Sequence, residues 1–246
     1  MTDLLRAPAK LTLSLRVLGR RADGMHTIDA EMVSVDLADE LRIEACDRTE
    51  VRVEGPAARG VLGGPRNLVA RALDAVGRTA SVTLVKHVPS GGGLGGGSSD
   101  AAAVLRWARC SELSVALGLG ADVPYCLRGG RARVQGTGGS VEPLEFEERT
   151  FTLLTPPLHV STPWVYGAWD DLDGPTGENG NDLEPAALIV EPGLQLWKDR
   201  LGEATGLEPR LAGSGATWFV EGAFPEVAVP GASVFVARTV PAGWGV

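Results

Sequence analysis

The sequence has little of what would point to a membrane or to a nucleic acid. No apolar run approaches the roughly 18 residues that a membrane span needs, and the N-terminal segment lacks the basic stretch and apolar core of a signal peptide. Lysine and arginine number 23 against 31 acidic residues, a formal net charge of −8, and they form no basic stripe. We therefore expect a cytoplasmic protein with no membrane or nucleic-acid partner.

Cysteine is also scarce. The three thiols, Cys46, Cys110 and Cys126, lie far apart in the chain and form no Cys-x-x-Cys pair. An odd number of widely spaced cysteines favours free, buried thiols in a reducing compartment over disulfides or a metal site. The 246 residues, 44% of them hydrophobic, suffice for one two-lobed unit or two small domains.

Glycine, by contrast, is abundant, and it is densest in the segment 88–100, Val-Pro-Ser-Gly-Gly-Gly-Leu-Gly-Gly-Gly-Ser-Ser-Asp. A β-branched strand precedes this segment and an alanine-rich helix follows it. Backbone without Cβ atoms can curl around a phosphate, and the helix start adds a partial positive charge. A bound anion would also offset the entropy lost when such a loop becomes ordered. The pattern predicts a phosphate-binding loop; a flexible linker is the alternative, which the flanking strand and helix disfavour.

Two familiar kinds of phosphate loop fit these letters poorly. Asp100 stands where the lysine of a P-loop would follow the last glycine. Gly91, Gly93 and Gly96 satisfy the spacing Gly-x-Gly-x-x-Gly, but a dinucleotide site also needs a second strand that ends in an acidic residue about twenty positions later. That region, 118–124, is broken by glycine and proline. A dinucleotide-binding reductase therefore stays an alternative from another class.

The pattern Pro-x-Gly-x-Gly-Leu-Gly-Gly-Gly-Ser-Ser-Asp-Ala-Ala is more specific, and it resembles the ATP loop of the GHMP small-molecule kinases. The resemblance is strongest to members that phosphorylate the 2-hydroxyl of a cytidine diphosphate-linked methylerythritol in the non-mevalonate isoprenoid pathway. It extends over 7–26, 118–130, 181–187 and 211–219. It implies ATP and Mg²⁺ as cofactors and a small-molecule substrate. The ATP-binding residues that it implies are Asn67, Pro89, Gly91, Gly92, Gly93, Leu94, Gly95, Gly96, Gly97, Ser98 and Ser99, with Ser99 also as a metal ligand.

The same resemblance implies a two-lobe α+β fold. An N-terminal mixed α/β lobe over 1–147 would bind ATP, and a shortened ferredoxin-like lobe would cover 148–246. The charged run 145–149 suggests the boundary between them. Alternating apolar and polar residues predict strands at 7–17, 31–37, 40–44 and 51–54, and helical spacing predicts helices at 67–76 and about 99–109. Little helix is expected between 220 and 233.

Two residues are candidates for catalysis. Lys10 lies on the polar face of the strand 7–17, opposite Leu11, Leu13, Leu15 and Val17, where an exposed edge charge is the simplest interpretation. The opening Ala-Pro-Ala-Lys-Leu resembles the family motif whose lysine sits in the active site. Asp122, in Gly-Ala-Asp-Val-Pro, resembles the family's general base, which would accept the alcohol proton. A helix N-cap before Pro124 is the alternative. A nearby Lys10 would keep Asp122 ionised.

Four residues are candidates for substrate binding. The segment 19–28 resembles the family motif whose histidine, here His26, contacts cytosine, and imidazole can both donate and accept hydrogen bonds. Met25 replaces a tyrosine that would flank the base, which keeps apolar contact but loses ring stacking. Thr12 replaces an asparagine. Tyr166 is a candidate for stacking on the cytosine, with core packing as the alternative.

Several functional alternatives remain at this point. Met25 and Thr12 leave open another GHMP kinase that acts on homoserine or a mevalonate-type substrate. A nucleotide-binding relative without catalysis is a third class, against which the retained Lys10 and Asp122 argue. The sequence also leaves a homodimer open.

Overall fold

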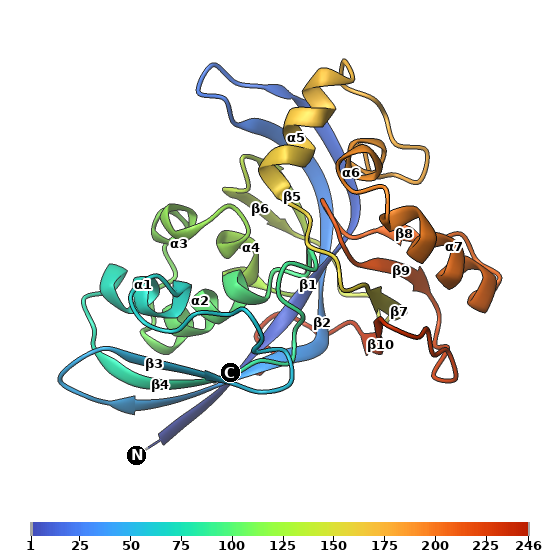
Figure 1. Ribbon diagram of the computed structural model, residues 1–246. Helices are drawn as coiled ribbons and strands as arrows, with labels where there is room; N and C mark the ends of the chain where they lie inside the picture. Colours follow the sequence, from blue (N-terminus) through green and yellow to red (C-terminus); the bar gives the residue numbers. More distant parts are fainter. Residues whose placement is uncertain (1, 246) are drawn as a thin grey trace.

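Two long antiparallel strands run through the whole molecule (Figure 1). In the computed structural model, which describes residues 2–245, β1 (Thr2–Arg20) pairs with β2 (His26–Ala45) along nearly its full length. The predicted strands 31–37 and 40–44 are therefore parts of one strand. Ala38 and Asp39, which lie between them, pair with Pro8 and Ala7, and a register shift between Pro8 and Ala9 leaves Asp36 and Leu37 unpaired with β1.

A second register shift, between Thr12 and Ser14, changes which side chains share a face of β1. Leu13 is the extra residue, so the alternation reverses after it. Leu11 and Leu13 pack in one core cluster, whereas Leu15 lines the same cavity as Thr12. The expectation that Leu11, Leu13, Leu15 and Val17 share one face is wrong, because period-2 alternation cannot reveal a bulge.

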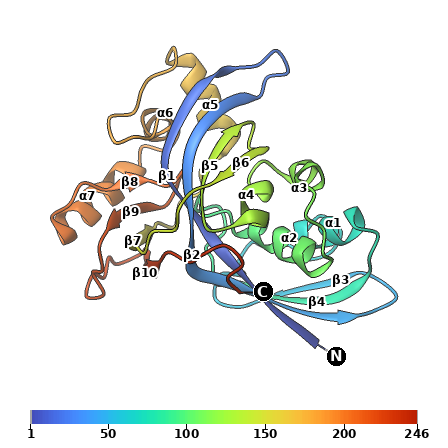
Figure 2. The ribbon, with the colours of Figure 1, turned by 180° about the vertical axis from the view of Figure 1, so that it is seen from behind.

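The first sheet has six strands, and α1 to α4 cover one side of it (Figures 1 and 2). Its order is β3-β4-β2-β5-β6, with β1 paired to β2; only β3 and β4 run parallel. The remaining strands of this sheet are β3 (Glu50–Glu54), β4 (Ala80–Val85), β5 (Arg131–Gly136) and β6 (Ser140–Pro143). The helices are α1 (Leu68–Ala75), α2 (Gly96–Trp107), α3 (Leu113–Leu119) and α4 (Val123–Arg128).

The second sheet belongs to the C-terminal part of the chain. Its order is β10-β7-β9-β8, with all neighbours antiparallel, and three helices precede β8 in sequence. The elements are β7 (Thr150–Thr155), α5 (Thr162–Asp171), α6 (Glu184–Val190), α7 (Leu194–Thr205), β8 (Arg210–Leu211), β9 (Trp218–Glu221) and β10 (Ser233–Arg238). This is the strand arrangement of a ferredoxin-like unit without its second helix, because residues 222–232 form only turns and loop. The predicted α+β fold and the missing helix are both confirmed.

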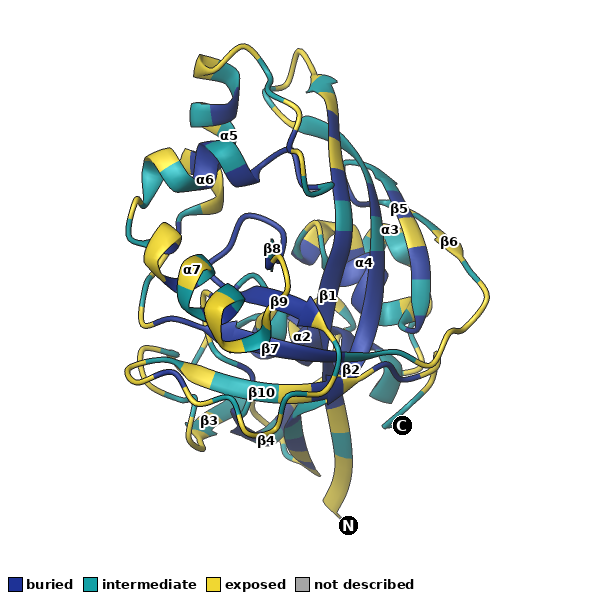
Figure 3. Cartoon of the chain, turned by 90° about the vertical axis from the view of Figure 1, so that its right-hand side faces the viewer, coloured by how far each residue is buried: buried dark blue, intermediate teal, exposed yellow. Residues whose placement is uncertain are grey.

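The core lies on both sides of β1 and β2 (Figure 3). On one side the middle of α2, residues 101–105, is completely or almost completely buried. On the other side Leu11 and Val33 pack against Phe151 and Phe219 of the second sheet. Because the two long strands are covered on both faces, they join the two sheets through a common core.

The thiols and the apolar segments add two observations. All three cysteines are free, but only Cys126 is buried, so the expectation of burial fails for Cys46 and Cys110.

Within residues 2–245, every helix is too short or too polar to cross a bilayer.

A buried polar contact ties the second sheet's connections to β1. Asp182 accepts hydrogen bonds from the backbone N–H groups of Val17 (2.9 Å) and Gly177 (3.0 Å), and it pairs with Arg16 at 2.6 Å. Next to it, the Asn181 amide donates to the carbonyl oxygens of Leu211 and Gly213. The letters Asn-Asp in this segment therefore serve to hold the two halves of the molecule together.

Replacing Asp182 with alanine should destabilise the protein strongly. The change leaves two buried N–H groups without an acceptor, and we expect a loss of roughly 3 kcal/mol in the free energy of unfolding. Urea titration followed by circular dichroism measures this loss. Glu178→Ala, at an exposed position in the same loop, is the matched control and should change stability by less than about 0.5 kcal/mol. Equal stabilities for the two variants would contradict the proposed contact.

Candidate active site

The glycine-rich segment forms a loop between β4 and α2 that is held from both sheets. The Leu94 carbonyl accepts a hydrogen bond from the Lys10 backbone N–H (2.9 Å), and the Gly92 carbonyl accepts one from Thr217 N–H (3.1 Å). Gly93 and Gly95 have φ values of +76° and +65°. A Cβ at Gly93 would lie 2.4 Å from the Ala212 carbonyl oxygen, and one at Gly95 would lie 2.6 Å from Lys10 Cγ. Both positions therefore require glycine.

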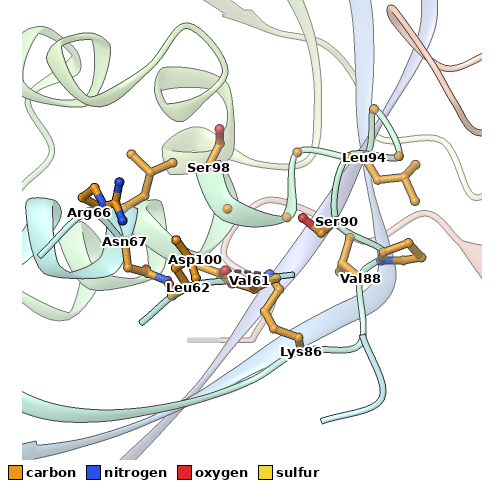
Figure 4. A pocket seen from close by; sticks show the side chains of 18 residues that line it. Val61, Leu62, Arg66, Asn67, Lys86, Val88, Ser90, Leu94, Ser98 and Asp100 are labelled. Carbon is orange, nitrogen blue, oxygen red and sulfur yellow. Dashed lines mark hydrogen bonds and ion pairs between the residues drawn. The ribbon is translucent and has the colours of Figure 1, made fainter. Parts of the chain in front are cut away.

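A cavity of about 530 Å³ lies along this loop (Figure 4). Apolar side chains of Val61, Leu62 and Val88 contribute to its wall, together with the backbone of the loop. Its volume is in the range of a small-molecule site. Ten of the eleven residues expected to bind ATP line it: Asn67, Pro89, Gly91, Gly92, Gly93, Leu94, Gly95, Gly96, Gly97 and Ser98. Asn67 also caps α1, since its Oδ1 accepts from Val69 N–H at 2.9 Å.

Ser99 is the exception. Helix α2 begins at Gly96, three residues before the predicted start, because Gly95 in the left-handed conformation forms its N-cap. Ser99 consequently lies in the first turn of the helix, fully buried, and its Oγ donates to the Pro8 carbonyl at 2.7 Å. This position does not fit the expected role of Ser99 as a phosphate or metal ligand. Ser98 instead lines the cavity.

A buried charged cluster, which sequence reasoning missed, supports the start of the loop. The Lys86 ammonium donates to Asp100 at 2.7 Å and to Asp39. Asp39 also accepts from the backbone N–H groups of His87 (2.6 Å) and Val88 (2.8 Å), which fixes the start of the loop. Burial would lower the pKa of Lys86, but the two carboxylates outweigh it and raise that pKa. The ammonium thus stays charged inside the protein.

The two carboxylates of this cluster share one cation. Burial is the main cause that raises the pKa of Asp100 to about 8; the nearby Asp39 adds to the shift, and Lys86 opposes it. One oxygen of Asp100, Oδ1, is buried and has no hydrogen-bond partner among residues 2–245. Protonation of Asp100 would relieve the repulsion between the two carboxylates, and we therefore expect Asp100 to hold its proton at pH 7.

This assignment predicts how stability depends on pH. Unfolded Asp100 ionises near pH 4, whereas the folded protein keeps the proton up to about pH 8. The unfolded state therefore binds fewer protons in that window, and the free energy of unfolding falls as pH rises, by up to about 1.4 kcal/mol per pH unit. Asp100→Asn, which resembles the protonated acid, should remove this contribution. Urea titrations from pH 5 to pH 8 test it.

The control for this experiment is Asp47→Asn, at an exposed position. It should keep the pH profile of the parent protein. A profile for Asp100→Asn that runs parallel to that of the parent would show that Asp100 is ionised in the folded protein throughout the range.

A second cavity, also about 530 Å³, lies on the other side of the same loop residues. It contains both candidate catalytic groups: Lys10 Nζ lies 3.8 Å from Asp122 Oδ2 and donates to Thr12 Oγ1 at 3.1 Å. Lys10 is only 5% exposed, so the interpretation as an exposed edge charge is wrong. Asp122 directly precedes α4, but its side chain makes no capping hydrogen bond. The carboxylate is 38% exposed and free to meet a ligand.

All four candidate substrate-binding residues line the same cavity, but Tyr166 packs against another of them, His26. Met25 is half exposed. Tyr166 on α5 stacks on His26, with ring centroids 4.6 Å apart and an angle of 25° between the planes. Burial, and secondarily Asp122, raises the pKa of Tyr166 to about 12. Sequence reasoning missed Asp170, whose Oδ1 lies 2.8 Å from His26 Nε2. Asp170 follows Tyr166 by four residues, which places both side chains on one face of a helix, and this spacing was the signal in the sequence that could have identified it.

The alternative of a dinucleotide site fails on the fold. The segment 118–124, where the second strand of such a site should lie, contains the end of α3 and the start of α4. No strand follows α2 before β5 in the part of the chain that the structure describes.

Comparison with known proteins first defines the class. A family model described as the GHMP kinases N terminal domain matches residues 67–130, which include the glycine-rich loop and Asp122. The homoserine kinase of Cytophaga hutchinsonii shares the fold, with a TM-score of 0.59 and 17% identity over 98% of this chain and 95% of its own. The fold is thus that of a GHMP kinase.

Two closer matches specify the family within that class. A 4-diphosphocytidyl-2-C-methyl-D-erythritol kinase of Ruegeria pomeroyi is 37% identical over 97% of this chain and 95% of its own length. A solved structure of a 4-(cytidine 5'-diphospho)-2C-methyl-D-erythritol kinase has a TM-score of 0.76 and 30% identity, and covers 97% of this chain and 99% of its own. The chain belongs to the 4-diphosphocytidyl-2-C-methyl-D-erythritol kinase family.

Proposed function

We propose that this protein transfers the γ-phosphoryl group of ATP to the 2-hydroxyl of 4-diphosphocytidyl-2-C-methyl-D-erythritol, which gives the 2-phosphate and ADP. The relatives carry this substrate in their names. The observation that carries the proposal is that the two cavities share a wall made of Gly93, Gly95 and Ser98. A nucleotide in the first cavity and an alcohol in the second would meet at this wall.

The roles of the catalytic residues follow from their positions around that wall. The loop N–H groups and the start of α2 would hold the triphosphate. Asp122 accepts the proton of the hydroxyl as the oxygen attacks the γ-phosphorus. Lys10, 3.8 Å from Asp122, offsets the negative charge that develops on the transferred group. Positioning and charge stabilisation account for most of the catalysis in such a reaction.

The donor groups near the wall fit a Mg²⁺ ion that comes with the nucleotide. Among residues 2–245 no three histidine, cysteine, aspartate or glutamate side chains gather into a metal site. Mg²⁺ commonly binds to substrate phosphates and only one or two protein oxygens. Ser98, which lines both cavities, is the residue that would supply such an oxygen in this protein. When bound, the ion neutralises negative charge on the phosphate oxygens.

The remaining part of the second cavity would hold the cytidine diphosphate end of the substrate. Thr12 lies beside Lys10, and Met25, His26 and Tyr166 lie further along the lining. The stacked pair of His26 and Tyr166 offers both a flat apolar surface and a ring nitrogen. These features suit a nucleobase better than a small amino acid such as homoserine.

A panel of alcohols tests the proposed substrate. With Mg-ATP and a coupled assay for ADP release, kcat/KM for the cytidine diphosphate-linked substrate should exceed the values for homoserine and mevalonate by at least about 100-fold. The base and diphosphate supply binding energy that the small alcohols lack. Turnover of homoserine or mevalonate at the higher rate would reassign the protein to another GHMP kinase. Binding of ATP without turnover of any alcohol would favour a non-catalytic relative.

Asp122→Asn tests the catalytic base. The amide cannot accept the alcohol proton, so kcat should fall about 100-fold to 10,000-fold, while the melting temperature and the affinity for ATP stay near those of the parent. Asp47→Asn, an exposed substitution of the same type, serves as the control and should keep parental activity. If kcat of Asp122→Asn stays within about threefold of the parent, Asp122 is not the base.

A further inference from the structure

His26 is held by neighbours on its edge and on its face. The residue follows the turn between β1 and β2, and α5 presents Tyr166 and Asp170 toward it from positions four residues apart. His26 Nε2 lies 2.8 Å from Asp170 Oδ1, while Asp170 Oδ2 pairs with Arg20 at 3.4 Å. Arg20, His26, Tyr166 and Asp170 all line the second cavity. The ring orientation is therefore set before any ligand arrives.

These contacts also determine which ring nitrogen carries the proton. An ionised carboxylate can only accept hydrogen bonds, so His26 Nε2 must be the donor to Asp170. In the neutral imidazole this contact places the one ring proton on Nε2. With the single ring proton on Nε2, Nδ1 keeps a free lone pair. Nδ1 makes no hydrogen bond to any residue from 2 to 245, so it is available to a ligand in the cavity.

A hydrogen-bond acceptor at His26 Nδ1 would distinguish cytosine from uracil. Cytosine carries a 4-amino group that donates hydrogen bonds, whereas the corresponding 4-oxygen of uracil only accepts them. We propose that Asp170 is a positioning residue that fixes His26 Nδ1 as the acceptor for the cytosine amino group, and that this gives the site its preference for cytidine over uridine. The inference rests on the proposed function, because it assumes a cytidine diphosphate-linked substrate.

Asp170→Asn should exchange the hydrogen-bonding roles of the two ring nitrogens of His26. Arg20 forms an ion pair with Asp170 Oδ2 and its guanidinium can only donate hydrogen bonds, so the amide oxygen will face Arg20 and the amide N–H₂ will face His26 Nε2. Nε2 then becomes the acceptor, and the ring proton moves to Nδ1. A donor at Nδ1 opposes the amino group of cytosine and matches the 4-oxygen of uracil. The ratio of kcat/KM for the cytidine substrate to that for its uridine analogue should fall roughly 10-fold to 100-fold, mainly through KM.

The matched control is Asp171→Asn, the next residue on α5, which is exposed. It should leave the ratio unchanged. A merely structural role for Asp170 would lower activity on both substrates together, so a ratio within about threefold of the parent overturns the inference while the proposed kinase function stands. If the parent protein turns over neither substrate, the proposed function fails, and calorimetric affinities of the same variants for CDP and UDP decide the inference separately.

NMR spectroscopy of the unaltered protein tests the inference without relying on a variant that folds. The chain has only three histidines, so the ¹⁵N and ¹H resonances of the His26 ring can be assigned. We expect the neutral tautomer with the proton on Nε2. A proton on Nδ1, or on both nitrogens at pH 7.5, would overturn the inference whatever the variants do.

Discussion

The glycine loop packs directly on β1, and this contact determines the arrangement of the active site. The Lys10 backbone N–H donates to Leu94, the Ser99 hydroxyl donates to the Pro8 carbonyl, and Gly95 lies against the Lys10 side chain. A substituent at Gly95 would displace the same lysine that pairs with Asp122. The loop that faces the first cavity and the charged pair in the second therefore keep one fixed relation, which a transfer between the cavities would require.

The sequence predicted those features that are encoded locally. Alternation located β1 and β2, helical spacing and an asparagine cap located α1, and the glycine pattern located the loop. The choice between Ser98 and Ser99 was not encoded in the same way. Neighbouring residues on a helix point about 100° apart, so the position of the helix start decides which hydroxyl reaches the cavity. That start depends on the left-handed conformation of Gly95, and six glycines in the segment offered several candidates.

Other parts of the site come from residues that are distant in the sequence. The cluster below the loop joins Asp39 of β2, Lys86 after β4 and Asp100 of α2, with 47 and 14 positions between the paired residues. His26 and Asp170 are 144 positions apart. Each of these charged residues looks like an ordinary surface residue in its local context. Only the tertiary fold shows that the Lys86 ammonium is buried between two carboxylates, or that Asp170 meets an imidazole.

The missing helix of the second sheet is compatible with the site because that helix is not needed to position any residue in it. One face of the sheet is covered by β1 and β2, through contacts of Phe151, Leu153 and Phe219 with Leu11 and Val33. The segment 222–232 contributes Val229 and Phe224 to the larger core cluster in place of a helix. Thr152 anchors this segment, since its hydroxyl donates to the Gly222 carbonyl and accepts from Phe224 N–H. The residues that reach the cavity come instead from α5 and from the turn at 213–214, which Asn181 holds through the Gly213 carbonyl. A short loop can thus replace the helix without moving either catalytic group.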